Sequence, residues 1–191
     1  SSVLKEVMNF FELPGVGSML AVQFLIQFAI QAIAPVLPLY IQRMTANPAY
    51  TASISGTIIA SAGLTSALAS AAIGRMTKSL TYKSILLVSS ALAAIAFAAQ
   101  AVAGNVFMLG TMRGISGFFL GAMLPTVNAM ISLLIPPHKR GVAYGVTTGA
   151  SQMGNVIGPL VGGTMALYLG TPSVFWLTAA LFGIVAIWSA S

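Results

Sequence analysis

The chain has 191 residues, of which 58% are hydrophobic and 5% are charged, and its formal net charge is +6. Soluble domains carry about a quarter charged residues, so this composition excludes a soluble fold and indicates a membrane protein. Cysteine and aspartate are absent, Glu6 and Glu12 are the only acidic residues, and His138 is the only histidine. This inventory provides no carboxylate pair, histidine-based triad or metal cluster. We therefore predict that the chain is no enzyme and binds no cofactor or metal.

The basic residues are spread over short polar segments and form no nucleic-acid-binding motif, so nucleic acid is excluded as a partner. The length allows roughly six membrane spans of 20–25 residues. With the N-terminus inside, six basic residues are cytoplasmic and Arg43 alone is outside, as the positive-inside rule requires. We expect a multi-pass protein of the plasma or inner membrane with both termini in the cytoplasm. The six basic residues are Lys5, Arg75, Lys78, Lys83, Lys139 and Arg140.

The first predicted span, residues 17–41, follows an amphipathic lead-in, residues 1–16, that should lie on the membrane surface. Within the span three glutamines recur every fourth residue and share roughly 80° of the helix face. Amides are disfavoured in lipid, so this stripe should face protein or a water-filled cavity. Hydrogen bonding between helices and contact with a substrate both remain open. Pro35 and Pro38 should distort the outer end of the span. The glutamines are Gln23, Gln27 and Gln31.

A basic loop, residues 74–83, joins a second span at about residues 52–73 to a third at about residues 84–103. Its sequence is GRMTKSLTYK, and Gly74, Arg75, Lys78 and Lys83 are the positions of interest. On the residues alone, the loop is a solvated turn that sets the orientation of the protein.

The fourth predicted span, about residues 106–135, carries Arg113 roughly eight residues inside it. Burying a guanidinium near mid-depth costs at least about 2–3 kcal/mol, which favours a functional role. The alternative is an arginine that reaches toward the headgroups or caps a carbonyl group. Gly117, Gly121 and Asn128 share a face within about 80° of Arg113, and Asn128 joins Arg113 and the glutamines as a candidate cavity residue.

The segment 145–163 reads GVTTGASQMGNVIGPLVGG and has the spacing G-x8-G-x3-G-P-x2-G-G. At about 100° per residue, three of its glycines share one side of a helix and others fall near the opposite side, so two neighbouring helices could approach closely. Pro159 removes a backbone donor and should bend the helix. The pattern consists of Gly145, Gly154, Gly158, Pro159, Gly162 and Gly163.

This spacing resembles the antiporter signature of the major facilitator superfamily, found in drug–proton exchangers. The loop 74–83 resembles a decayed copy of the signature loop of that superfamily, with Lys78 where the family has Asp, and the Arg113 segment resembles the fourth helix of one half. The resemblance implies an all-α membrane fold of six helices, which is one half of a twelve-helix transporter. It implies two inverted three-helix repeats, at about residues 17–103 and 106–190, within a bundle of residues 17–191. The decayed loop and the lead-in, which resembles an interdomain linker, favour the C-terminal half.

The resemblance further implies export of amphipathic, often cationic compounds, coupled to proton entry by alternating access. No carboxylate lies in a predicted span, so protons would have to pass through the other half. The expected partners are the lipid bilayer, a second six-helix half and a small amphipathic substrate. Two alternatives remain open: a small carrier for another solute that works as a homodimer, and an isolated membrane fragment without transport activity.

Overall fold

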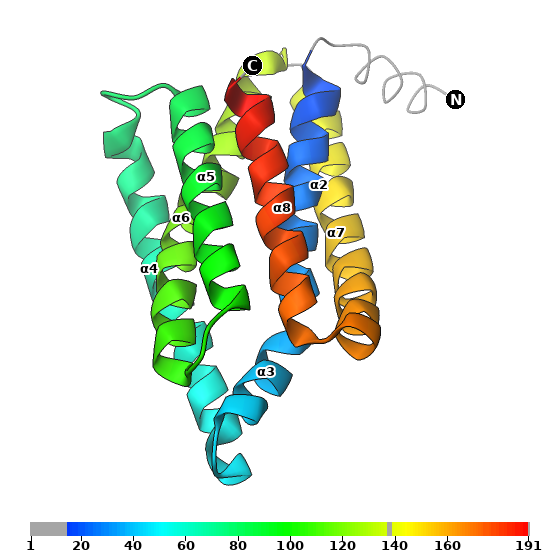
Figure 1. The fold of residues 1–191 in the computed structure, drawn as a ribbon. Coiled ribbons are helices and arrows are strands. Elements are labelled where there is room, and N and C mark those ends of the chain that lie inside the picture. Colours follow the sequence, from blue (N-terminus) through cyan, green and yellow to red (C-terminus); the bar gives the residue numbers. More distant parts are fainter. Residues whose placement is uncertain (1–14, 137–138, 191) are drawn as a thin grey trace.

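The computed structural model describes residues 15–136 and 139–190, and these residues form an all-α fold (Figure 1). Most of the lead-in, with Glu6 and Glu12, lies outside the described residues, as does His138. The elements are α2 (Val16–Ile33), α3 (Val36–Met44), a 3-10 turn η1 (Pro48–Tyr50), α4 (Thr51–Met76), α5 (Tyr82–Ala101), α6 (Val106–Leu134), α7 (Arg140–Leu169) and α8 (Thr171–Ala190).

Five segments of the described chain are long and apolar enough to cross a membrane. Helix α7 is not among them, although its 30 residues exceed the roughly 20 that a span needs. Glycine, threonine and amide residues lower its hydropathy below that of the other helices. The protein is thus a multi-pass membrane protein in which α7 is the least apolar of the six long helices. The five segments are Val16–Met44, Pro48–Met76, Tyr82–Ala101, Val106–Leu134 and Thr171–Ala190.

Local sequence signals explain where the helices begin and end. The side chain of Thr81 caps α5 by accepting a bond from the Ser84 amide at 3.2 Å, and Asn105 caps α6 through the Met108 amide at 2.8 Å. Gly170, between α7 and α8, has a φ of 86°, which favours glycine. The first span is interrupted before Pro35, where α2 ends and α3 begins, so the predicted distortion at this end is present.

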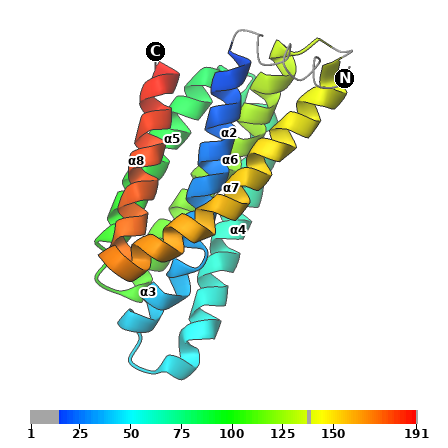
Figure 2. The ribbon, with the colours of Figure 1, turned by 90° about the vertical axis from the view of Figure 1, so that its right-hand side faces the viewer.

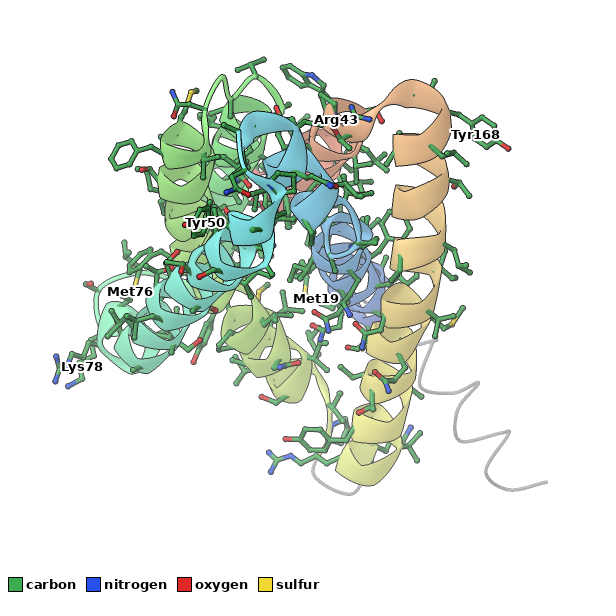
Figure 3. All side chains as sticks on the ribbon, turned by 90° about the horizontal axis from the view of Figure 1, so that it is seen from below. Met19, Arg43, Tyr50, Met76, Lys78 and Tyr168 are labelled. Carbon is green, nitrogen blue, oxygen red and sulfur yellow. The ribbon has the colours of Figure 1, made fainter. Side chains whose placement is uncertain are left out.

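The long helices run alternately up and down, and α2 begins at the same end of the bundle where α8 finishes (Figure 1). The closest helix pairs are α2 with α7, α4 with α6, and α5 with both α8 and α6. Figure 2 shows α2 and α7 side by side. In Figure 3, seen from the end that carries Arg43, α4 and α7 lie on opposite flanks and α2 lies between them.

The core lies where α5 and α8 meet α2 and α6. Phe97 and Phe182 are buried and stack with ring centroids 5.4 Å apart. The Tyr40 ring packs against Phe175 at 5.2 Å, and its hydroxyl donates to the Ala101 carbonyl at 3.1 Å, which ties α3 to the end of α5. These aromatic contacts join α5 to α8 and α3 to α8.

By contrast, α4 and α7 leave long apolar side chains uncovered. Of the 18 most apolar consecutive residues in the span that contains α4, 17% are buried, against 50% in the span of α5. Exposed apolar side chains of this kind face lipid or another protein in a membrane. They are Ile59, Leu64 and Leu68 on α4, and Val156, Leu160 and Leu167 on α7.

Candidate functional site

A seam of small residues joins α7 to α2. A Cβ atom added at Gly154 would lie 2.8 Å from the Phe28 amide nitrogen, and one at Gly158 would lie 2.8 Å from the Phe28 carbonyl oxygen. At Gly162 an added Cβ would overlap the Ala32 carbonyl group. Real Cβ contacts are longer than this, so the two backbones approach to a distance that only glycine permits.

The glycines on the opposite side of α7 do not lie at close contacts. No described atom lies within 4 Å of a Cβ added at Gly145, Gly149 or Gly163. The second close helix that the sequence allowed for is therefore not present among the described residues. Pro159 sits half-buried inside α7, which continues as a helix on both sides of it.

The glutamine stripe of α2 lies along the same seam and pairs with polar residues of α7. Gln23 is 5% exposed, and its Nε2 donates to Ser151 Oγ at 3.0 Å. Gln27 donates to Asn155 Oδ1 at 3.2 Å, and Asn155 in turn donates to Gln152 Oε1 at 2.6 Å. The hydrogen bonds between helices that the sequence left open are thus present for two of the glutamines.

The three glutamines differ in how far their side chains are exposed. Gln23 Oε1 is buried and has no hydrogen-bond partner among the described residues. Gln27 and Gln31 are half-buried, and Gln31 packs with its Cβ against the position of Gly158. Contact of this stripe with a substrate stays a prediction, and its half-buried members are the better candidates.

A second seam of small residues joins α6 to α4. A Cβ added at Gly117 would lie 2.8 Å from the Ala62 Cα, and one at Gly121 would overlap the Ser66 backbone. Ser70 Oγ donates to the Gly121 carbonyl at 2.7 Å. Ala62, Ser66 and Ser70 recur every fourth residue, the spacing of a small-residue helix contact, and the sequence reasoning did not single them out.

Arg113 points toward α5 rather than toward the glutamine seam. Its guanidinium lies 5.7 Å from the centroid of the Phe97 ring, and its Nε and Nη1 atoms are buried without hydrogen-bond partners among the described residues. Asn128, farther along α6, is exposed. The structure therefore does not gather the predicted cavity residues into one cluster: the glutamines lie between α2 and α7, and Arg113 lies between α6 and α5.

The predicted basic loop is shorter than expected, because α4 continues through Gly74 and Arg75 to Met76. Lys83 belongs to the first turn of α5, and Lys78 lies in the turn between the two helices. All four are exposed. No group of three histidine, cysteine, aspartate or glutamate side chains occurs in the described part of the chain.

Curated bacterial proteins resemble this chain over most of its length. It is 31% identical over 171 residues to a multi-drug resistance efflux pump PmrA homolog of Lactococcus lactis, covering 90% of this chain and 42% of that protein. It is 30% identical to the uncharacterized MFS-type transporter YuxJ of Bacillus subtilis, covering 93% of this chain and 45% of that protein. It is 32% identical to the multidrug resistance protein MdtG of Salmonella typhi, covering 83% and 39%. The chain thus spans less than half the length of these relatives.

One protein family matches nearly the whole chain. Residues 19–190 match the model described as Major Facilitator Superfamily, and the chain therefore belongs to that superfamily.

Proposed function

We propose that this chain is one six-helix half of a secondary active transporter that exports drug-like amphipathic compounds in exchange for protons. The observation that carries the proposal is the combination of a family match over residues 19–190 with a length below half that of the relatives. Two of those relatives are named as multidrug resistance or efflux proteins. The proposed role is that of a carrier and not of an enzyme.

The packing supports two inverted repeats, residues 17–103 and 106–190. The long helices of the first unit are α2, α4 and α5, and those of the second are α6, α7 and α8. If α2 is exchanged with α6, α4 with α7 and α5 with α8, the α2–α7 pair becomes the α6–α4 pair and the α5–α8 pair becomes itself. All three of these pairs are closely packed. In transporters built of inverted repeats, alternating access is largely a rocking of one repeat or bundle against the other around a fixed site.

Two surface grooves repeat this relationship with the same residue spacing at opposite ends of the bundle. Both combine positions i, i+3, i+4 and i+7 of two helices. The first groove contains Gly17, Leu20, Ala21 and Phe24 of α2 with Val146, Gly149, Ala150 and Met153 of α7. The second contains Phe107, Gly110, Thr111 and Gly114 of α6 with Ile54, Thr57, Ile58 and Ser61 of α4, and Ser53 and Val106 line it in addition.

In this proposal the polar side of the α2–α7 seam, with Gln27, Gln31 and Asn155, forms part of the wall of a central cavity. The uncovered apolar faces of α4 and α7 meet the second half or lipid. The loops with Lys78 and Lys139 lie in the cytoplasm, as the positive-inside rule requires. The chain corresponds to the C-terminal half, because its loop 74–83 is a decayed form of the family signature.

Proton coupling needs a group that gains and loses a proton between the two access states. The only acidic residues are Glu6 and Glu12, which precede the spans, and an arginine such as Arg113 stays protonated at physiological pH. We therefore assign proton transfer to the second half, whose membrane carboxylates would complete the carrier.

Co-expression tests this function in cells. The chain should co-purify with an acid-bearing six-helix half, and the pair should lower the accumulation of a fluorescent amphipathic dye, whereas neither half alone should do so. Arg113→Ala should reduce extrusion by the pair more than Lys139→Ala, because only Arg113 lies within the membrane. Dye extrusion by the chain without the second half would instead favour a homodimeric carrier.

A further inference from the structure

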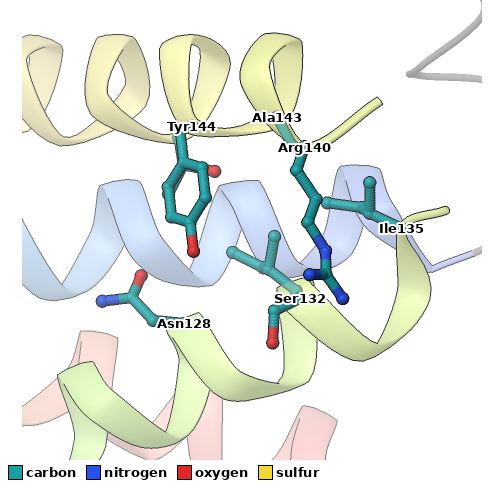
Figure 4. Close-up of a pocket in the computed structure, with 8 residues that line it drawn as sticks. Asn128, Ser132, Ile135, Arg140, Ala143 and Tyr144 are labelled. Atoms are coloured by element: carbon teal, nitrogen blue, oxygen red, sulfur yellow. The ribbon is translucent and has the colours of Figure 1, made fainter. Parts of the chain in front are cut away.

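A cleft lies between the last turns of α6 and the first turns of α7 (Figure 4). The cleft is partly open to its surroundings and has a volume of about 20 Å³. A site that holds one water needs about 10–15 Å³, so the cleft has room for a single oxygen atom of a larger ligand. The polar residues that line the cleft are Asn128, Ser132, Arg140, Tyr144 and Thr147.

Thr147 supplies a buried hydroxyl group that lacks a partner. Its side chain is 8% exposed, and its Oγ1 atom has no hydrogen-bond partner in the described residues. Two other buried threonines donate to the carbonyl group four residues earlier: Thr126 to Ala122 at 2.7 Å and Thr178 to Val174 at 2.9 Å. A buried hydroxyl without a partner is unfavourable, so a ligand atom that accepts its hydrogen bond would be stabilised in the cleft.

The charge around the cleft is positive and has no internal counter-ion. Arg140 stands at the start of α7, where the helix dipole is also positive, and residues 15–136 and 139–190 contain no aspartate or glutamate. In Figure 4, Arg140 extends from α7 toward Ser132 of α6, and Tyr144 extends toward Asn128. Guanidinium, phenol, amide and hydroxyl groups therefore line one cleft, and donors of these kinds suit a phosphate group, although Ser132 Oγ already donates to the Ala129 carbonyl at 2.8 Å.

We propose that this cleft binds the phosphate group of an anionic phospholipid. One phosphate oxygen enters the cleft and accepts a hydrogen bond from Thr147, while the other oxygens remain at the mouth and pair with Arg140. The cleft lies at the end of the bundle that carries Arg75, Lys78 and Lys139, which is headgroup depth for helices that span a bilayer. Basic pockets between membrane helices on the cytoplasmic side are known to bind anionic headgroups.

The test uses the purified chain in nanodiscs of phosphatidylcholine that contain a graded fraction of phosphatidylglycerol. The measurement is the phosphatidylglycerol retained per protein by native mass spectrometry after partial delipidation. Arg140→Gln and Thr147→Val should each weaken retention about tenfold, since each removes a donor to a charged oxygen. Thr147→Ser keeps the hydroxyl group and should retain the lipid, which separates loss of binding from loss of fold.

Two matched variants serve as controls. One tests whether any basic residue at this end attracts the lipid, and the other tests whether loss of a hydroxyl outside the cleft weakens retention. Arg75→Gln removes an exposed charge at the same end, and Thr148→Val removes the neighbouring exposed hydroxyl, and neither residue lines the cleft. Both should retain the lipid as the unmodified chain does. If Arg75→Gln weakened retention as strongly as Arg140→Gln, or if Thr147→Val had no effect, the proposed site would be refuted.

A second arm distinguishes a lipid from a free phosphate. Inorganic phosphate is titrated against the chain in the phosphatidylglycerol nanodiscs, and it should not displace the lipid at millimolar concentration. Displacement that depends on Thr147 would mean that the cleft takes free phosphate, which would overturn the lipid assignment. Transport is not measured in either arm, so this outcome is independent of the proposed function.

Discussion

Gly162 and Ala32 lie so close that a Cβ atom at Gly162 would overlap the Ala32 carbonyl group. This contact lies near the end of a seam that begins at Gly154 and holds α7 against α2. Close backbone approach of this kind stabilises membrane helices mainly through packing, because lipid supplies no hydrophobic driving force between them. Integrity of the seam is thus a condition for any role of the adjacent glutamine stripe.

Replacing Gly158 with leucine should therefore destabilise the bundle. The new side chain would meet the Phe28 carbonyl oxygen and the Gln31 side chain, and overpacking of this kind costs about 1–3 kcal/mol. The measurement is the thermal midpoint of unfolding in detergent. Gly149→Leu is the matched control, because no described atom lies near its Cβ position, and its midpoint should stay close to that of the unmodified chain. Equal midpoints for both variants would contradict the observed contact.

The hydrogen bond between Gln23 and Ser151 should contribute about 1 kcal/mol of coupling free energy. A double-mutant cycle with Gln23→Leu and Ser151→Ala measures this coupling through unfolding of the bundle. Gln31 with Ser151 serves as the control pair, because no hydrogen bond joins those two residues, and its coupling should be close to zero. Similar coupling in both cycles would mean that the pairing along the seam differs from that described.

Water access should differ among the glutamines. The chain has no cysteine, so a single introduced cysteine can be labelled without background. Cysteine at Gln31, which is half-buried, should react with a water-soluble maleimide faster than cysteine at Gln23, which is 5% exposed. The reverse order would contradict a cavity at this seam, and equal slow reaction at both positions would assign the stripe to helix packing alone.

Cysteine labelling also tests the orientation. Ser79, in the turn with Lys78, and Ala46, after α3 at the opposite end of the bundle, are each replaced by cysteine in separate variants. A membrane-impermeant reagent added to intact cells should label the Ala46 position and spare the Ser79 position. Labelling of Ser79 alone would invert the proposed topology.

The sequence was sufficient for the helices and for the position of the glycine seam. The lengths of the apolar segments predict the spans within a few residues, and Pro35 marks the break in the first one. A repeat of four residues likewise identifies the face on which Gly154, Gly158 and Gly162 lie.

What the sequence could not predict was the neighbour that each face meets. Arg113 shares a helix face with glycines, yet it contacts Phe97 of α5, because the rotation of α6 is set by packing in three dimensions. Ser151 and Asn155, the partners of the glutamines, are far away in the chain, and only the packing of α7 on α2 brings them together. Glycine and charged residues predict a loop from Gly74 onward, whereas α4 continues through Gly74 to Met76.

Transport in proteoliposomes tests the half-transporter proposal most directly. The purified chain is reconstituted alone and together with an acid-bearing second half, and uptake of an amphipathic dye is followed after a proton gradient is imposed. The proposal predicts no proton-driven transport by the chain alone and recovery of transport with the second half. Robust proton-driven transport by the chain alone would contradict it, because the described spans contain no carboxylate to carry the proton.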